Sequence, residues 1–111
     1  EREELEDQTL LQAREQRRGE REARERRRQE WLRRRRPLLR EAQELEARIS
    51  AMEQQKRELD QQLGDAGFYA DSSPEAVRSA SQRCGELANL LTEAEERWLE
   101  LQEQLEALGE P

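Results

Sequence analysis

The chain has 111 residues, of which 42% are Asp, Glu, Lys or Arg and 32% are hydrophobic, and its formal net charge is -7. This composition excludes a conventional multilayer globular core and favours long helices or disorder. No apolar stretch approaches the roughly 20 residues that span a bilayer and no signal segment opens the chain, so we predict a cytoplasmic protein with no membrane partner. Since the chain starts at Glu1 and not at methionine, we expect it to be part of a longer protein.

Cys84 is the only cysteine, and histidine is absent. The sequence therefore offers no internal disulfide, no imidazole base for a cysteine nucleophile and no zinc site of ordinary composition. We expect no catalytic residue, no metal, no cofactor and no small-molecule substrate. We interpret Cys84 as a buried structural residue.

Charge divides the chain into three blocks. Residues 1–13 carry a net -4, residues 14–40 carry +8 from thirteen arginines and five acids, and residues 41–111 carry -11. A partner therefore meets a basic segment attached to an acidic rod.

Residues 1–36 are predicted to form a charged, arginine-rich linker that is helical or disordered. Three pairs of opposite charge have the spacing and order that support a helix: Glu20 with Arg24, Glu22 with Arg26, and Glu30 with Arg34. Gly19 weakens this helix. A residue before proline disfavours helical angles, so we expect a kink at Arg36.

A heptad seam follows from Pro37 to Leu63. Its inward positions alternate in steps of three and four residues: Leu38, Ala42, Leu45, Ile49, Met52, Lys56, Leu59 and Leu63. Pro37 suits a first helical turn, and Gly64 suits a left-handed cap after the last turn. The pattern predicts a helix over about residues 37–63.

The same spacing recurs from residue 77 to residue 108. Its positions are Val77, Ala80, Cys84, Leu87, Leu91, Ala94, Trp98, Leu101, Leu105 and Leu108. Ser72 and Glu75 have the spacing of a capping box, so we predict a helix over about residues 74–108. Two helices with narrow apolar stripes need each other, and the connection of about ten residues is long enough for the second to fold back.

The predicted fold is therefore all-α, a two-helix antiparallel coiled-coil hairpin over residues 37–111. In the expected register Trp98 lies opposite Ala42, Leu91 opposite Ile49, and Cys84 opposite Lys56, so that large residues face small ones. The Lys56 stem is expected to follow the seam and to carry its ammonium to water.

The ends of the hairpin are expected to be covered by aromatic side chains. Phe68 and Tyr69 of the connection are expected to cap the end of the seam that lies beside it. The second helix outruns the first, so its last turn is expected to meet Trp31 and Leu32.

The arginine segment has two interpretations. Its charge can simply keep a solvated linker soluble. The sharper interpretation is phosphate binding, because the guanidinium fork matches phosphate geometry and a basic stretch releases counterions when it meets a polyanion. Trp31 could stack on a base, although packing on the end of the hairpin is the alternative that we favour.

Three sequence marks carry a family resemblance. Pro37-Leu38-Leu39-Arg40-Glu41 opens the first helix, Leu63-Gly64-Asp65 with Phe68-Tyr69 forms the connection, and Glu96-Arg97-Trp98-Leu99-Glu100 lies near the end of the second helix. Over about residues 37–108 the chain resembles the C-terminal coiled-coil domain of ABC-F proteins, soluble ATPases with two ATP-binding cassettes on one chain. The arginine-rich stretch resembles the basic linker that precedes this domain.

The resemblance implies an accessory role in a protein that acts on the ribosome or in translation, with RNA or DNA as the partner. No GxxxxGK[ST] phosphate loop occurs in the chain, so no ATP-site residue is carried over. The second helix is strongly acidic, which moves the predicted nucleic-acid contact to the basic segment. The candidate residues are Arg26, Arg27, Arg28, Arg33, Arg34, Arg35, Arg36 and Arg40.

The main alternative is a structural coiled coil that binds no nucleic acid and pairs with another helix or with itself through exposed residues such as Leu90 and Leu99. Binding of anionic lipid by the arginines ranks last, because the segment lacks the apolar face of an interfacial helix. An enzyme is not expected, since a two-helix rod offers no pocket that would shift the pKa values of its carboxylates.

Overall fold

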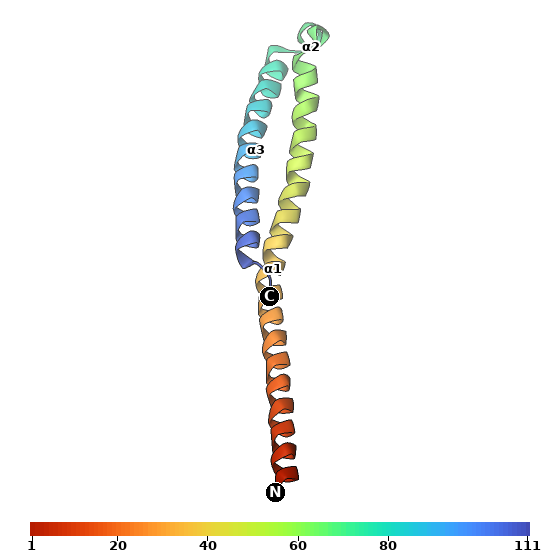
Figure 1. The fold of residues 1–111 in the computed structure, drawn as a ribbon. Helices are drawn as coiled ribbons and strands as arrows, with labels where there is room; N and C mark the ends of the chain where they lie inside the picture. The colour runs from red at the N-terminus through yellow and green to blue at the C-terminus, as the bar shows by residue number, and fades with distance from the viewer.

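The computed structural model describes all 111 residues and consists of three helices. Helix α1 spans Arg2–Leu63, the short helix α2 spans Ala66–Asp71, and α3 spans Pro74–Leu108. Helix α3 folds back along the C-terminal part of α1, while the N-terminal part of α1 continues alone beyond the end of α3 (Figure 1). The predicted all-α, antiparallel hairpin is confirmed.

Helix α1 is continuous through Pro37, so the predicted helix start at Pro37 is wrong, while the predicted kink at Arg36 stays a prediction. A proline inside a helix removes one hydrogen bond, here the bond to the carbonyl of Arg33. Both Arg33 and Pro37 are exposed on α1, so water can solvate the freed carbonyl. Strong helix formers on both sides of the proline hold the remaining turns.

A thin apolar seam holds α1 and α3 together. Seven residues are buried: Ala42, Leu45, Ala80, Leu87, Leu91, Ala94 and Leu101. Leu38, Ile49, Met52 and Trp98 pack against the cluster formed by Ala42, Leu45, Ala94 and Leu101. A large tryptophan therefore packs beside a small alanine, as predicted.

Two polar links fix the register of the hairpin. The Arg97 guanidinium donates to both carboxylate oxygens of Glu41, at 2.8 and 2.9 Å. The Trp98 indole N–H donates to Glu46 at 3.0 Å. Since Glu41 and Glu46 flank Ala42 on α1, these contacts confirm the predicted register of Trp98.

The connection is more ordered than a simple loop. Asp65 caps α2 by accepting a hydrogen bond from the Gly67 N–H at 3.1 Å. Ser73, followed by Pro74, caps α3 by accepting from the Ala76 N–H at 3.1 Å, so the predicted capping box starting at Ser72 is wrong. Gly64 has a right-handed φ of -87°, which contradicts the predicted left-handed cap although α1 does end at Leu63.

Two predictions about single residues near the connection need correction. Cys84 is half-buried and not buried, and its thiol donates to Asp60 at 3.1 Å. Tyr69 is 51% exposed, so it does not cap the seam, although its ring meets that of the half-buried Phe68 edge to face. A separate helical turn in the connection carries both rings, and this turn holds Tyr69 in solvent.

Asp60 binds both Cys84 and Lys56, so these two residues, which were predicted to lie opposite each other, share one partner. The half-buried Lys56 places its ammonium 2.9 Å from Asp60, and this pairing raises the pKa of Lys56. The hydrogen bond to the Asp60 carboxylate, followed by desolvation, raises the pKa of Cys84. The thiol is therefore held in its neutral form, which agrees with a structural role.

Candidate nucleic-acid interface

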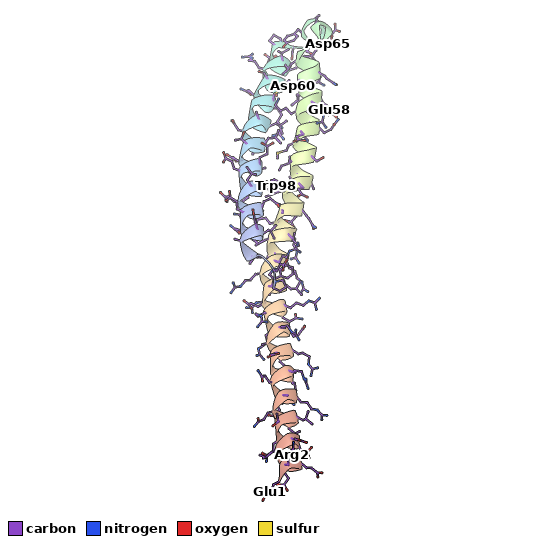
Figure 2. The ribbon with its side chains drawn as sticks, viewed as in Figure 1. Glu1, Arg2, Glu58, Asp60, Asp65 and Trp98 are labelled. Atoms are coloured by element: carbon purple, nitrogen blue, oxygen red, sulfur yellow. The ribbon has the colours of Figure 1, made fainter.

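The basic segment begins on a part of α1 that stands free of the hairpin. Residues 2–30 extend beyond Gly109, which caps the C-terminal end of α3 (Figure 1). The Trp31 indole N–H donates to the Gly109 carbonyl at 2.8 Å and so marks the point where the two helices part. The predicted contact between Trp31 and the end of α3 is confirmed. Figure 2 shows side chains projecting to both the left and the right of the free part of α1.

The predicted site residues divide between the free helix and the junction. Arg26, Arg27 and Arg28 lie on the free part of α1, and all three are exposed. The quartet Arg33 to Arg36 follows Trp31 and Leu32. Arg40 lies farther along α1, in the part of this helix that packs against α3. All eight residues share one helix, but they point to different sides of it.

Glu30 engages two arginines of the quartet. It forms an ion pair with Arg33 and another with Arg34, the latter at 3.0 Å. Hydrogen bonds from Arg33 and then Arg34 lower the pKa of Glu30. The two arginine side chains remain 76% and 65% exposed, so they keep surface for a second partner.

Arg35 differs from the rest of the predicted set. It is half-buried, and its guanidinium carbon lies 5.1 Å from the centroid of the Trp31 ring. This distance is that of a cation–π contact. Arg35 therefore stabilises the junction, and Trp31 packs on the end of the hairpin.

Four predicted residues come together on one face. Arg26, Arg33, Arg36 and Arg40 recur in steps of seven, three and four residues, which places them on the side of α1 opposite the seam. We call this set the back stripe. Arg27 and Arg28 lie outside it, so the predicted set does not form a single surface.

The sequence interpretation missed a second row of arginines. Arg14, Arg17, Arg21 and Arg24 lead to Arg28 in steps of three and four residues, and all five are exposed. The heptad spacing of these arginines indicates the row in the sequence, but the predicted site was based on the runs of adjacent arginines at residues 26–36.

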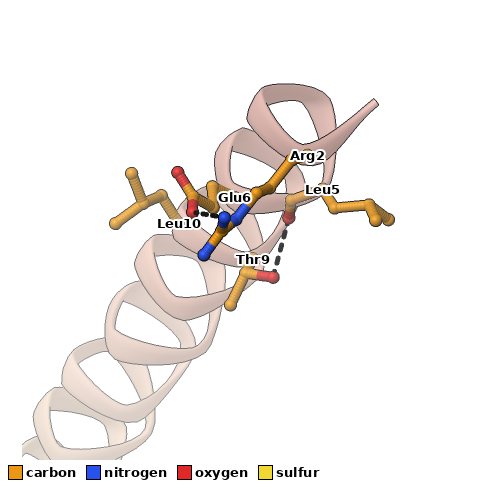
Figure 3. A pocket seen from close by; sticks show the side chains of 5 residues that line it. All are labelled: Arg2, Leu5, Glu6, Thr9 and Leu10. Atoms are coloured by element: carbon orange, nitrogen blue, oxygen red, sulfur yellow. Dashed lines mark hydrogen bonds and ion pairs between the residues drawn. The ribbon is translucent and has the colours of Figure 1, made fainter.

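The free helix has no enclosed pocket. Near its N-terminus Arg2, Leu5, Glu6, Thr9 and Leu10 line a shallow depression on one side of the helix (Figure 3). Its polar groups are used locally, since the Thr9 hydroxyl donates to the Leu5 carbonyl at 2.8 Å and Arg2 lies 3.8 Å from Glu6. Nothing in this depression converges on a ligand.

The structure also bears on metals and membranes. No group of three or more His, Cys, Asp or Glu side chains is placed to hold a metal ion. None of the three helices combines the length and the apolar character that crossing a bilayer requires.

Comparison with known proteins gives one match. A family model described as ABC transporter C-terminal domain matches residues 34–103. The match begins within the arginine quartet, includes the connection, and ends five residues before the end of α3. No curated protein and no solved structure matched the chain.

Proposed function

The chain belongs to the ABC transporter C-terminal domain family, and from this premise we propose that it is a non-catalytic accessory domain of a soluble ABC-F ATPase that binds nucleic acid through its basic segment. The nucleic acid would be ribosomal or transfer RNA on the ribosome, or DNA, in the cytoplasm. ATP hydrolysis would take place in cassettes elsewhere in the parent protein.

One observation carries this proposal: the basic segment is presented on a helix that is largely uncovered by the rest of the chain. Six of the eight predicted residues form no intramolecular ion pair, and five of these six also make no cation–π contact: Arg26, Arg27, Arg28, Arg36 and Arg40. Their guanidinium groups are free to pair with phosphates. The acidic hairpin repels a polyanion and would direct it to the basic segment.

Binding across a salt series tests the proposal. The chain would be titrated with a DNA duplex and with a structured RNA, beside a variant with Arg26, Arg27, Arg28 and Arg33 to Arg36 changed to Gln. For duplex DNA, the slope of log affinity against log salt should fall by about 0.9 for each phosphate that the variant no longer neutralises. A control variant with Arg48, Arg57, Arg78 and Arg83 changed to Gln should bind like the parent chain, because these arginines lie on the acidic hairpin.

A structural coiled coil remains the second candidate, favoured by exposed leucines on both long helices. Leu5, Leu10 and Leu11 are 65%, 55% and 55% exposed, and Leu90 and Leu99 are 42% and 55% exposed. If no nucleic acid binds at low salt while the chain associates with itself or with another helix in high salt, this second function replaces the first.

A further inference from the structure

The row of arginines on the free helix continues the seam of the hairpin. From Leu38 the steps of three and four residues lead backward through Arg35 and Trp31 to Arg28, and onward to Arg14 and Leu10. Between Trp31 and Leu10 every position in this line is an arginine: Arg14, Arg17, Arg21, Arg24 and Arg28. We call these five residues the seam-line stripe. In the hairpin α3 covers this face of α1, whereas beyond Gly109 nothing covers it (Figure 1).

The stripe is uniform in charge and free of internal partners. None of its five arginines forms an ion pair within the chain. The acids of the same segment occupy other positions of the helix, and Glu20, the predicted i,i+4 partner of Arg24, forms no ion pair with it. At about 1.5 Å of rise per residue the stripe is about 21 Å long, with one guanidinium for about every 5 Å.

We propose that the seam-line stripe binds the phosphate backbone of a nucleic acid, and that it contributes more to binding than the arginine quartet does. This inference rests on the proposed function and names the surface that carries it. The quartet is less available, because Glu30 engages Arg33 and Arg34, and Trp31 engages Arg35.

Charge and chemistry favour a phosphate backbone over a protein helix as the occupant. A partner helix in a coiled coil needs apolar residues at the seam positions, and the stripe has none between Leu10 and Trp31. A phosphate backbone needs no apolar contact. It presents a regular row of anions, and guanidinium groups bind these in pairs of hydrogen bonds.

A shuffle that preserves charge tests the position of the arginines. In this variant Arg14→Gln is combined with Gln12→Arg, Arg17→Gln with Gln16→Arg, and Arg28→Gln with Gln29→Arg. Composition, net charge and helix propensity stay the same, while three of the five arginines leave the stripe. Circular dichroism would verify that the helix content of the variant matches that of the parent chain.

For the DNA duplex, the slope of log affinity against log salt should fall by about 0.9 for each arginine moved. At 0.1 M salt, neutralising one phosphate contributes about eightfold to the affinity, so the loss of more than one such contact should lower the affinity at least tenfold. Unchanged affinity would overturn the proposal. Increased affinity would also overturn it, because Gln29 lies on the back stripe and an arginine there would complete that row.

A matched pair of variants separates the stripe from general charge. One variant has the five stripe arginines changed to Gln, and the other has Arg2, Arg48, Arg57, Arg78 and Arg83 changed to Gln, so each loses five positive charges. At 0.1 M salt we expect a loss of at least about 100-fold in duplex affinity for the first and less than about threefold for the second. Equal losses would show that net charge alone governs binding and would overturn the proposal.

The outcomes also distinguish this inference from the proposed function. If the parent chain binds neither the duplex nor the structured RNA at low salt, both fall together. If binding is strong and survives in the stripe variant, only the stripe is rejected and the accessory nucleic-acid function stands.

Discussion

The two parts of α1 share one heptad spacing but fill it with different residues. In the hairpin the inward positions hold side chains such as Ala42 and Leu45, which α3 buries. In the free part the same positions hold arginines from Arg14 to Arg28, which are exposed. The hairpin is therefore held by packing between helices, whereas the free part is held only by local helix propensity and side-chain pairs.

The largest expected effect tests the packing in the hairpin. Leu101 is fully buried, and Leu101→Ala should destabilise the hairpin by about 2–5 kcal/mol, because it removes apolar packing and leaves a cavity in a thin seam. Urea unfolding followed by tryptophan fluorescence would measure the change. Leu10→Ala, at a position that is 55% exposed in the free helix, is the control and should change stability by less than about 0.5 kcal/mol. Comparable losses for the two variants would mean that the free part also packs against something.

Pro37 joins the two parts and allows a test of their continuity. Pro37→Ala restores an N–H that can donate to the Arg33 carbonyl, so it should stabilise the helix around the junction by about 1–3 kcal/mol. Slower hydrogen exchange on either side of residue 37 would report the gain. Pro74→Ala is the control, because proline is favoured in the first turn of α3 and its replacement should bring no gain. Faster exchange in Pro37→Ala would contradict a continuous α1.

Gly19 in the free part of α1 and Gly85 in α3 allow the same substitution to be compared in the two parts of the molecule. A Cβ added at Gly19 or at Gly85 meets nothing within 4 Å, so alanine at either position should favour the helix by about 1 kcal/mol. Gly85→Ala should raise the melting temperature of the hairpin, because α3 folds only as part of it. Gly19→Ala should increase helicity at 222 nm without moving that melting temperature. A shift in the melting temperature for Gly19→Ala would show that the two parts unfold as one unit.

The smallest effect concerns pH. Hydrogen bonds from Arg97 hold the pKa of Glu41 below its ordinary value of 4.5. Because the folded-state pKa is the lower one, the stabilisation is fully present above pH 4.5 and is lost as pH falls through the folded-state value. Glu41→Gln should lower the melting temperature of the hairpin by a few degrees at neutral pH and by less in acid. A difference between parent and variant that stays constant down to pH 2 would exclude this source.

The spacing of apolar residues and the positions of Pro and Gly predicted the helix bounds with different success. The bounds of α3 were predicted correctly, because Pro74 and Gly109 agree with the ends of its apolar stripe. The start of α1 was predicted wrongly, because the same reasoning gave Pro37 the role of a helix start. A proline on an exposed face is tolerated within a helix when its neighbours are strong helix formers. A rule for proline alone leaves out the summed helix propensity of those neighbours.

The predicted site shows a similar limit. Clusters of adjacent arginines were identified from the sequence, yet neighbours in sequence point to different sides of a helix. The structure instead groups Arg26 with Arg33, Arg36 and Arg40, and it assigns Arg35 to Trp31. The contact between Trp31 and Gly109 depends on where α3 ends, which no local pattern of α1 contains. The contact between Arg35 and Trp31 joins residues four apart on one helix, so it was within reach of the sequence.

The unpaired extension of α1 also governs how the molecule behaves in solution. The chain measures 102 × 16 × 14 Å, and its radius of gyration is 28.5 Å, about twice the roughly 13 Å of a compact domain of 100 residues. A monomer of this shape diffuses slowly and elutes from a sizing column like a much heavier globular protein. Its oligomeric state should therefore be determined from light scattering or sedimentation equilibrium, which report mass independently of shape.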